Sequence, residues 1–483
     1  MNKRESISIT ANLIAGILSL SPAMAQKTTV LSEGRPNILL ILSDDHSAPY
    51  LGCYGNPDLK TPNIDRIAKE GILFRRAYTT APQCVPSRAS ILTGRNVLDV
   101  QMLRFSAPLD KNIITFQELL RKAGYYTGIC GRIFHLDGSN DNPQETIETF
   151  NEFGMVTFPK RVDYLGESTR DEDGKVLSQA VEFLDQIPGN KPFSLWVNYR
   201  DPHRAFGAKE YEPDPEKIHV PEVMPDTKLL REDLAGYLGE IQRLDYHVGL
   251  LLAELEKRGK LDNTLIVFMG DNGGALLRGK GTLYDCGIHV PLLVRWPGKI
   301  KPGKTADILI SGEDIAPTLL AVAGLTPEEK MTGKSFLQTL TGEEKDVREY
   351  VFAVRGAHGY ELPLNSGVFD LSRVVFNKKY KLIYNPLWQL PYYPVDFGGN
   401  KFWKELIQFN NENKLDKRFS GTTLFTKQRP MFELYDLEKD PGEFVNLSGK
   451  EEYREIEHRM KGAMQRWMII YRDVVPLPIT LLN

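Results

Sequence analysis

Polar residues follow two apolar segments of the chain at the points where those segments end. One apolar run leads to Asp44 and Asp45, and a second leads to Asp271, Asn272 and Gly273. In an open parallel sheet, ligands bind beyond the carboxyl ends of the strands, so neighbouring ends would bring these oxygens together. Crowded anions favour a bound cation, and all-oxygen donors favour Ca²⁺ or Mg²⁺ over Zn²⁺. Either pair alone is more typical of turn or capping residues, but the two together predict a metal site.

A cysteine and an arginine lie one helical turn apart in Cys84-Val85-Pro86-Ser87-Arg88. Pro86 suits the first turn of a helix and Gly94 suits its end, which puts Cys84 just before a helix N-terminus. Backbone NH groups there favour an anion, and Arg88 lies on the same face. A reactive thiolate and a buried structural cysteine are the alternatives, although the spacing is shorter than in cysteine-dependent phosphatases.

The motif around Cys84 resembles the signature of type I sulfatases, the formylglycine-dependent branch of the alkaline phosphatase superfamily. The cysteine motif is highly specific, whereas the family's other motifs are weak singly and strong together. They follow in order over about residues 35–450: Pro36-Asn37-Ile38 leading to Asp44-Asp45, then Cys84-x-Pro86-Ser87-Arg88 with Leu92-Thr93-Gly94-Arg95, Asp271-Asn272-Gly273, Lys280-Gly281-Thr282-Leu283-Tyr284 with Val290-Pro291, and Leu434-Tyr435-Asp436-Leu437 with Asp440-Pro441 and Asn446-Leu447.

The resemblance implies which residues carry the reaction. A maturation enzyme would oxidise Cys84 to formylglycine, whose hydrate supplies a nucleophilic hydroxyl activated by Ca²⁺ and Arg88. His203 would protonate the leaving group, His135 would take a proton from the gem-diol, and Lys280 would bind the sulfate. The implied metal ligands are Asp44, Asp45, Cys84, Asp271 and Asn272, and the implied catalytic residues are Cys84, Arg88, Arg132, His135, His203 and Lys280.

Arg132 departs from the family pattern. It lies in Gly131-Arg132-Ile133-Phe134-His135, where the family has a lysine. A guanidinium is a planar fork and an ammonium is a compact point charge, so the exchange is not neutral. The sequence leaves open whether Arg132 contacts the oxygen of the nucleophile as the lysine would. We interpret His46 and His289 as structural residues.

Apolar, β-branched runs alternate with helical patterns through the first part of the chain. This alternation predicts an α/β fold, with a large, mainly parallel sheet sandwiched by helices. The resemblance to type I sulfatases implies that this fold is alkaline phosphatase-like. The expected strands are residues 37–42, 126–129, 193–199, 265–269, 290–296 and 308–310, and the expected helices are residues 63–70, 87–93, 116–123 and 229–257.

The pattern changes after about residues 341–345. Strands are expected at residues 349–354, 373–384 and 432–436 without long helices between them, and an amphipathic helix at residues 451–471. These elements predict a smaller antiparallel sheet plus helix. The loop-rich residues 385–430 are dense in proline and aromatic residues, which suits either a cleft lining or simple packing. The predicted organisation is a signal peptide at residues 1–25, a catalytic α/β domain at 35–345 and a C-terminal α+β subdomain at 346–483.

The N-terminus has the pattern of a secretory signal. Lys3 and Arg4 precede the apolar residues 7–20, and Ala23-Met24-Ala25 provides a cleavage site. The apolar stretch is short for a bilayer, and no later run has the length of a span. The sequence therefore predicts a periplasmic or secreted protein without a membrane span.

Charge and cysteine content exclude other classes. The chain has 60 basic and 63 acidic residues and a net charge of −3, which gives no sign of a nucleic-acid partner. Four cysteines are too few for a disulfide framework in an exported chain of 483 residues. One pair among Cys53, Cys84, Cys130 and Cys286 could form a bridge, and the sequence does not select it.

Exported members of this family usually act on sulfated carbohydrates, so the resemblance implies a sulfated saccharide, such as a glycosaminoglycan or mucin-type glycan, as substrate. Residues 373–376, 379–385 and 390–393 loosely resemble heparan N-sulfatases (sulfamidases), which makes N-sulfoglucosamine hydrolysis the second candidate, whereas Lys280 fits the O-sulfatase pattern better. A phosphonate or phosphodiester hydrolase and a non-catalytic glycan-binding protein are further alternatives. Arg355 and His358 are candidates for sugar contacts, although exposed polar residues more often have no such role.

Overall fold

The computed structural model describes residues 34–104, 108–137, 144–167, 173–343, 345–358 and 365–478. The predicted signal peptide, residues 1–25, lies outside these ranges. In the described parts of the chain, no helix is both long enough and apolar enough to cross a membrane. The four cysteines all lie in the described ranges and are all free, so the possible disulfide is not formed.

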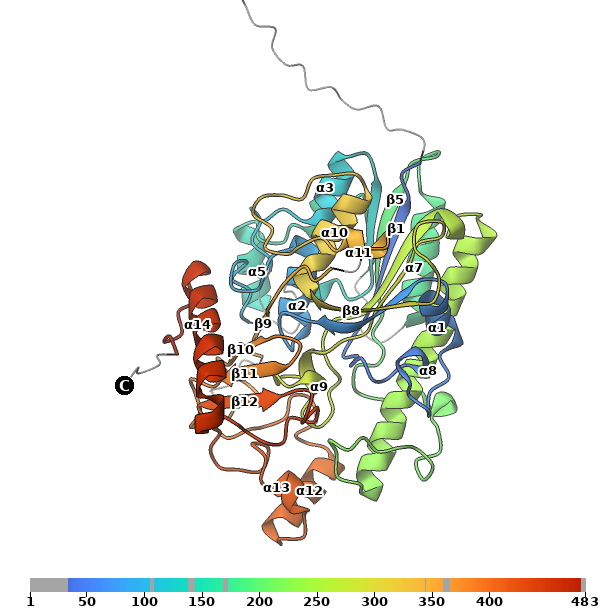
Figure 1. The fold of residues 1–483 in the computed structure, drawn as a ribbon. Coiled ribbons are helices and arrows are strands. Elements are labelled where there is room, and N and C mark those ends of the chain that lie inside the picture. The colour runs from blue at the N-terminus through green and yellow to red at the C-terminus, as the bar shows by residue number, and fades with distance from the viewer. Residues whose placement is uncertain are drawn as a thin grey trace, which may run out of the picture. The chain divides into compact units, whose positions relative to one another are not determined.

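Among the described residues, the larger sheet has eight strands in the order β4-β3-β5-β1-β6-β7-β2-β8 (Figure 1). Its centre, β5, β1 and β6, is parallel, while β7 runs antiparallel to both β6 and β2. The prediction of a mainly parallel sheet is therefore confirmed. The strands are β1 (Asn37–Ser43), β2 (Ile72–Tyr78), β3 (Tyr126–Cys130), β4 (Tyr164–Leu165), β5 (Phe193–Asn198), β6 (Thr264–Gly270), β7 (Leu292–Arg295) and β8 (Lys304–Ser311).

Helices cover both faces of this sheet because alternate residues of a strand point to opposite sides. Leu39 and Ile41 of β1 belong to the core that α1, α7 and α8 cover, and Leu40 and Leu42 belong to the core that α2, α3 and α10 cover. These helices are α1 (Pro62–Lys69), α2 (Cys84–Thr93), α3 (Phe116–Lys122), α7 (Asp173–Asp185), α8 (Lys228–Lys257) and α10 (Ile315–Val322); shorter ones are α4 (Phe134–Asp137), α5 (Gln144–Glu152), α6 (Phe158–Arg161), α9 (Asp285–Ile288) and α11 (Leu337–Leu340).

The second sheet is antiparallel, with the order β12-β11-β10-β9, and α14 packs on it (Figure 1). Phe352 of β9 stacks on Trp467 of α14 with ring centroids 4.9 Å apart. The smaller antiparallel sheet with a helix is therefore confirmed. Its elements are β9 (Val351–Val354), β10 (Arg373–Phe376), β11 (Tyr380–Tyr384), β12 (Phe432–Asp436) and α14 (Arg454–Ile470), with α12 (Lys401–Asn411) and α13 (Lys417–Ser420) between β11 and β12.

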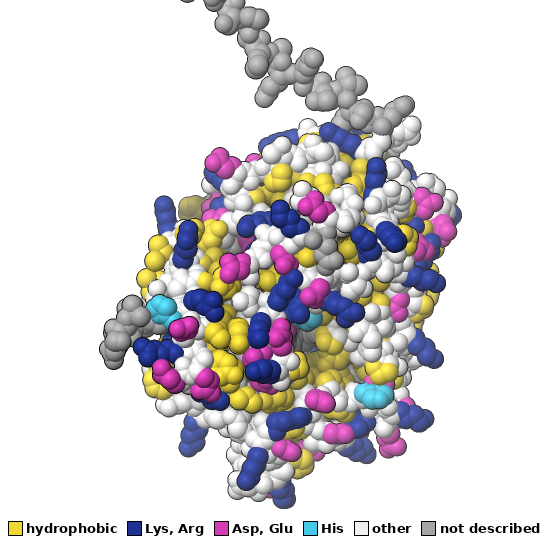
Figure 2. All heavy atoms as spheres, in the orientation of Figure 1, with side chains coloured by type: hydrophobic (Ala, Val, Ile, Leu, Met, Phe, Trp, Pro, Cys, Tyr) yellow, Lys and Arg dark blue, Asp and Glu magenta, His cyan; other side chains and the backbone are white. Residues whose placement is uncertain are grey.

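Some elements differ from the sequence-based expectations. Residues 373–384 form two strands, because the Asn377 side chain accepts hydrogen bonds from the NH groups of Lys379 and Tyr380 and closes a turn. β2, α7, α10 and α12 were not predicted. Basic and acidic side chains are interspersed over the face in Figure 2, in keeping with the small net charge. The domain boundary at residue 345 stays a prediction.

Candidate active site

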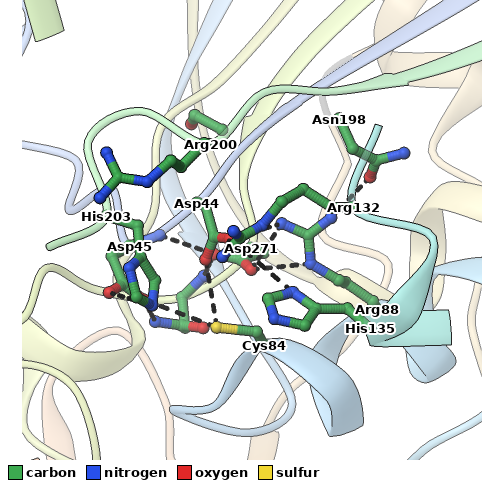
Figure 3. A network of polar contacts seen from close by, with 12 residues as sticks. Asp44, Asp45, Cys84, Arg88, Arg132, His135, Asn198, Arg200, His203 and Asp271 are labelled. Carbon is green, nitrogen blue, oxygen red and sulfur yellow. Dashed lines mark hydrogen bonds and ion pairs between the residues drawn. The ribbon is translucent and has the colours of Figure 1, made fainter. Parts of the chain in front are cut away.

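The two polar strand ends lie side by side because β1 and β6 are neighbours. Ser43 pairs with Gly270 at the last position of the ladder, so Asp44, Asp45 and Asp271 leave the sheet at one edge. The Asp45 NH donates to Asp271 Oδ1 at 2.9 Å, which ties the two ends together. All three carboxylates are fully buried. The convergence expected from the sequence is thus observed (Figure 3).

Cys84 lies against this cluster. Its Sγ is 3.1 Å from Asp44 Oδ1 and 3.7 Å from Asp45 Oδ1, and Asp44, Asp45, Cys84 and Asp271 each offer a ligand atom within 4.8 Å of the others. Helix α2 begins at Cys84 itself, with extended Gln83 as its N-cap, so the helix starts earlier than predicted. Cys84 therefore belongs to the first turn, where backbone NH groups favour negative charge.

The Ser87 and Arg88 side chains fix α2 to the end of β6. Ser87 Oγ donates to the carbonyl of Asp271 at 2.5 Å. Arg88 is completely buried; its Nε donates to Asp271 Oδ2 at 2.9 Å, and its Nη1 donates to Asn198 Oδ1 at 2.6 Å. Arg88 Nη2 also lies 3.5 Å from Asp44 Oδ2. The guanidinium thus bridges the ends of β5 and β6 next to Asp44.

Arg132 forms an ion pair with Asp44 through Nη2 and Oδ2. It follows Gly131, where any Cβ would lie 2.2 Å from the carbonyl oxygen of Asn198, so only glycine fits this close approach. Arg132 has a φ of 52°, and Asp45 and Asp396 also have left-handed backbone at 63° and 67°. Such conformations in residues other than glycine persist where the surroundings hold them, and they concentrate at functional sites.

The two predicted histidines lie on opposite sides of the cluster (Figure 3). His135 Nδ1 is 3.7 Å from Asp44 Oδ2, and His203 Nε2 is 3.7 Å from Asp45 Oδ2. Lys280 Nζ is buried and lies 3.0 Å from Asp45 Oδ2. All six predicted catalytic side chains are therefore gathered at the same edge of the sheet. By contrast, His46 is bound by Ser43 Oγ and the Tyr50 carbonyl, as expected for a structural histidine.

Asp396 is a residue of this site that sequence reasoning missed. Its Oδ2 lies 2.6 Å from Lys280 Nζ and 3.8 Å from His203 Nε2, and its Oδ1 lies 3.7 Å from His358 Nε2. His358, a candidate for a sugar contact, therefore does face the site. The available signal was an acidic residue within the loop-rich segment that we considered as a cleft lining.

Arg355 is buried and binds backbone carbonyls, including Gly281 at 3.1 Å and Gly367 at 2.9 Å. Arg355 is therefore not an exposed polar residue, and a contact between Arg355 and the sugar stays a prediction. Burial lowers the pKa of its guanidinium to about 10. The side chain thus ties the end of β9 to the residue that follows Lys280.

The ionisable groups of the cluster differ in how their pKa values are shifted. Burial, and then the nearby Asp44 carboxylate, raise the pKa of Asp271 to about 7. Burial also raises the pKa of Asp44, but Arg132 and Arg88 outweigh it and hold that pKa well below its usual range. Burial and Asp44 raise the pKa of the Cys84 thiol well above its usual value. These residues by themselves therefore disfavour a reactive thiolate at position 84.

The donor set fits a divalent cation that prefers oxygen. The Oδ1 atom of Asn272 is buried next to the three carboxylates and has no hydrogen-bond partner in the described structure. A buried amide oxygen without a partner is costly, and a cation among the carboxylates would satisfy it and relieve their repulsion. Hard oxygen ligands favour Ca²⁺ or Mg²⁺. The residues present thus match the metal ligands that the sequence predicts.

Together, this fold and this cluster define the class of hydrolases that act on anionic esters. The chain belongs to the sulfatase family, whose model matches residues 36–325, and it is therefore an enzyme of the class that hydrolyses sulfate esters. A second model, described as N-sulphoglucosamine sulphohydrolase, C-terminal, matches residues 277–390.

Known proteins resemble most of the chain. An ulvan-active sulfatase from Formosa agariphila is 30% identical over 471 residues, which cover 95% of this chain and 86% of the relative. Human N-sulphoglucosamine sulphohydrolase is 29% identical over 482 residues, covering 90% of this chain and 91% of the relative. The solved structure of BT4656, in complex with its substrate D-glucosamine-2-N,6-O-disulfate, has a TM-score of 0.67 and 22% identity, covering 92% of this chain and 100% of that one.

Proposed function

We propose that this enzyme hydrolyses sulfate esters of a sulfated carbohydrate, such as a glycosaminoglycan or mucin-type glycan. The observation that carries the proposal is the position of Cys84 Sγ, 3.1 Å from Asp44 Oδ1 in a cluster of three buried carboxylates. The carbohydrate part rests on the relatives, one of which is an ulvan-active sulfatase.

We propose that Asp44, Asp45, Asp271 and Asn272 hold Ca²⁺ and that a maturation enzyme converts Cys84 to formylglycine, which joins the metal ligands. The ion would offset the charge of the sulfate, and the hydrated aldehyde would supply the attacking hydroxyl. The raised pKa of the Cys84 thiol disfavours a thiolate nucleophile at this position. Arg88 would hold Asp271 and Asp44 in their ligand positions through its contacts with both carboxylates.

The two histidines suit opposite proton transfers. Burial, and then Arg132, lower the pKa of His135, so its imidazole is neutral at neutral pH and can accept a proton beside Cys84. His203 lies on the side of Lys280 and Asp396, where it would donate a proton to the departing oxygen from Nε2. Burial and Lys280 also lower the pKa of His203, so we expect the protonated form to prevail only on the acidic side.

Lys280 and Arg132 would bind the sulfate oxygens. Both cations lie at the carboxylates of the cluster, Lys280 at Asp45 and Arg132 at Asp44. A sulfate bound between Lys280 and Arg132 would accept hydrogen bonds from these two cations, which now pair with Asp45 and Asp44. The fork of Arg132 can donate to Asp44 and to a second oxygen acceptor together, which a lysine does less well.

N-sulfoglucosamine hydrolysis is the second candidate. The match of residues 277–390 to the C-terminal model of N-sulphoglucosamine sulphohydrolase favours it. The likeness to human N-sulphoglucosamine sulphohydrolase extends over 90% of this chain. Release of sulfate from defined mono-O-sulfated sugars, measured beside N-sulfoglucosamine, decides between the two.

The experiment that tests the proposed reaction uses protein matured with a formylglycine-generating enzyme and supplied with Ca²⁺. We expect 4-nitrophenyl sulfate and at least one sulfated sugar to be hydrolysed faster than 4-nitrophenyl phenylphosphonate. A phosphonate or phosphodiester hydrolase on the same fold would show the reverse order. Absence of turnover with every sulfate ester and N-sulfo sugar would contradict the proposed function.

We further propose that residues 1–25 are a cleaved signal peptide and that the mature enzyme is periplasmic or secreted. Lys3, Arg4 and the site ending at Ala25 support this proposal. Sulfated polysaccharides are extracellular polymers, which agrees with export. N-terminal sequencing of protein recovered from the periplasm or medium tests it, with Gln26 expected as the first residue.

A further inference from the structure

We infer that Asp396 selects the substrate by the ring position next to the sulfo group: it accepts a hydrogen bond from a hydroxyl or amine there, and it excludes a second sulfate. This inference rests on the proposed function, since it concerns the sugar that enters the same site. Asp396 lies beyond residues 277–390, the segment that matches the C-terminal family model.

The position of Asp396 puts its carboxylate next to the leaving group. Its Oδ2 is 2.6 Å from Lys280 Nζ and 3.8 Å from His203 Nε2, the two groups proposed to contact the sulfate and the departing atom. Asp45, His203 and Asp396 each offer an atom within 4.8 Å of the others. Asp396 contacts both Lys280 and His203. It would therefore be within reach of the substituent on the sugar carbon next to the one that carries the sulfo group.

The loop that carries Asp396 is built to hold this carboxylate. Val395 and Phe397, on either side, are buried, and a Cβ on Gly281 would lie 2.4 Å from Val395 Cγ2, so the loop packs directly against the residue after Lys280. Asp396 itself has left-handed backbone, which its surroundings must maintain. From the other side, His358 Nε2 lies 3.7 Å from Asp396 Oδ1, while Gln83 Nε2 lies 3.3 Å from His358 Nδ1.

The charge of Asp396 determines what it can recognise. Burial alone would raise its pKa, but Lys280 and His358 outweigh burial and hold the pKa well below its usual range, so the side chain is a carboxylate at neutral pH. A carboxylate only accepts hydrogen bonds, which suits O–H and N–H groups. It repels a sulfate, because like charges placed against each other in a binding site disfavour the wrong partner.

There is space for a sugar ring on the open side of Asp396. Its side chain is 27% exposed and lines a cavity of about 540 Å³, together with Arg204, Phe206, Asp233 and Phe402. This volume is within the range of small-molecule sites. Arg204 forms an ion pair with Asp233 there, and its guanidinium lies 4.2 Å from the Phe206 ring centroid, so two contacts hold this side chain in the wall. The sugar would approach the catalytic cluster past Asp396.

The test compares sugars that differ only at the neighbouring ring position. The pairs are methyl galactoside 3-sulfate with its 2,3-disulfate, and N-sulfoglucosamine with its 3-O-sulfated form; 4-nitrophenyl sulfate reports the reaction without a sugar. For the productive pair, we expect the wild-type enzyme to prefer the monosulfated member by about 100-fold in kcat/KM. Asp396→Asn should reduce kcat/KM for that member by about 30-fold, reduce the aryl sulfate less, and lower the preference at least about tenfold.

A role of Asp396 in merely positioning Lys280 gives a different result. Both members of the productive pair and 4-nitrophenyl sulfate would then lose rate by the same factor, and the preference for the monosulfated sugar would stay unchanged. This result would overturn the inference. Asp262→Asn is the matched control, because Asp262 is 90% exposed and precedes β6 at the end of the strand remote from Asp271. We expect this control to behave as wild type with every substrate.

Binding separates this inference from the proposed reaction. In a Cys84→Ser background, calorimetry measures the affinity for both members of each pair with and without Asp396→Asn. A preference for the monosulfated sugar that shrinks on Asp396→Asn supports the inference even if matured wild-type protein releases no sulfate, which would contradict only the proposed function. Equal affinities for both members in the presence of Asp396 would overturn the inference while leaving sulfate release intact.

Discussion

The strand-end cluster and the Asp396 loop meet at Lys280, yet they are built in different ways. Asp44, Asp45 and Asp271 are fully buried and fixed by the ladder between β1 and β6. Asp396 and His358 keep 27% and 17% of their side chains exposed and come from loops around the smaller sheet. On the proposed function, the sheet edge would hold the reactive groups, while the loops would supply the contacts that decide which sugar is accepted.

The largest expected effect on turnover comes from the cysteine of the strand-end cluster. Cys84→Ser removes the group that can become formylglycine, so hydrolysis of 4-nitrophenyl sulfate should fall by at least about 10⁴-fold. Cys53→Ser is the control, because Cys53 is also a free thiol but lies outside the cluster, and it should retain wild-type turnover. Wild-type rates in Cys84→Ser would contradict the role of the strand-end cluster.

Removal of the metal should have the next largest effect. Chelation should lower kcat by about 10³-fold, and added Ca²⁺ should restore it, because the ion offsets charge in the transition state. Without a cation, the pKa of Asp271 rises from its usual 3.8 to about 7. A raised pKa in the folded state means that its contribution to stability is complete at low pH and is lost as pH rises toward about 7.

Calorimetric melting temperatures across that pH range provide the measurement. Relative to metal-free Asp271→Asn, the metal-free wild-type protein should lose stability between pH 4 and 7, and Ca²⁺ should restore it at neutral pH. In metal-free Asp271→Asn, this part of the pH dependence should disappear. Metal-free wild-type and Asp271→Asn proteins whose melting temperatures change in parallel over this range would argue against an uncompensated carboxylate at Asp271.

His203 lies where the two regions meet, and its loss should have an intermediate effect. His203→Ala should reduce kcat/KM for a sugar sulfate by about 10²–10³-fold, but should affect 4-nitrophenyl sulfate much less, because nitrophenolate leaves without a proton. Burial and Lys280 lower the pKa of His203 from 6.5. The rate with the sugar should therefore fall as pH rises, with its midpoint below 6.5, while the aryl sulfate should lack this limb. Equal losses for both esters would exclude His203 as the acid.

The sequence itself could predict the strand-end carboxylates and the Cys84–Arg88 pair because short-range patterns place them. His135, His203 and Lys280 followed instead from the resemblance to the sulfatase family. Asp44 and Asp271 each follow a fully apolar strand, and Cys84 and Arg88 are one helical turn apart, so their placement needs only strand ends and a helix start. Asp396 could not be found in this way, since its position depends on the packing of Val395 against Gly281, which are far apart in sequence. The same applies to β2, whose place between β7 and β8 is a long-range choice.

The smallest expected effect on turnover concerns the smaller sheet. Arg373 of β10 binds Asp473, beyond α14, through two hydrogen bonds of 2.6 and 2.8 Å, and both side chains are completely buried. Asp473→Asn leaves the Arg373 charge without a counterion, so we expect a loss of about 3–5 kcal/mol in the free energy of unfolding. Well below the melting temperature, kcat for the aryl sulfate should stay unchanged.

Urea denaturation and initial rates on the same preparation check this separation. Lys378→Gln is the control, because its ion pair with Asp346 is largely exposed and should contribute little to stability. A fall in kcat for Asp473→Asn at unchanged folded fraction would show that the smaller sheet also shapes the reactive groups.

A crystal structure of the matured, active enzyme with Ca²⁺ tests the central claim most directly. We predict an oxidised side chain at position 84 and an ion about 2.3–2.6 Å from oxygens of that side chain and of Asp44, Asp45, Asp271 and Asn272. An active preparation with an intact thiol at position 84, or an ion bound away from these four residues, would contradict the account.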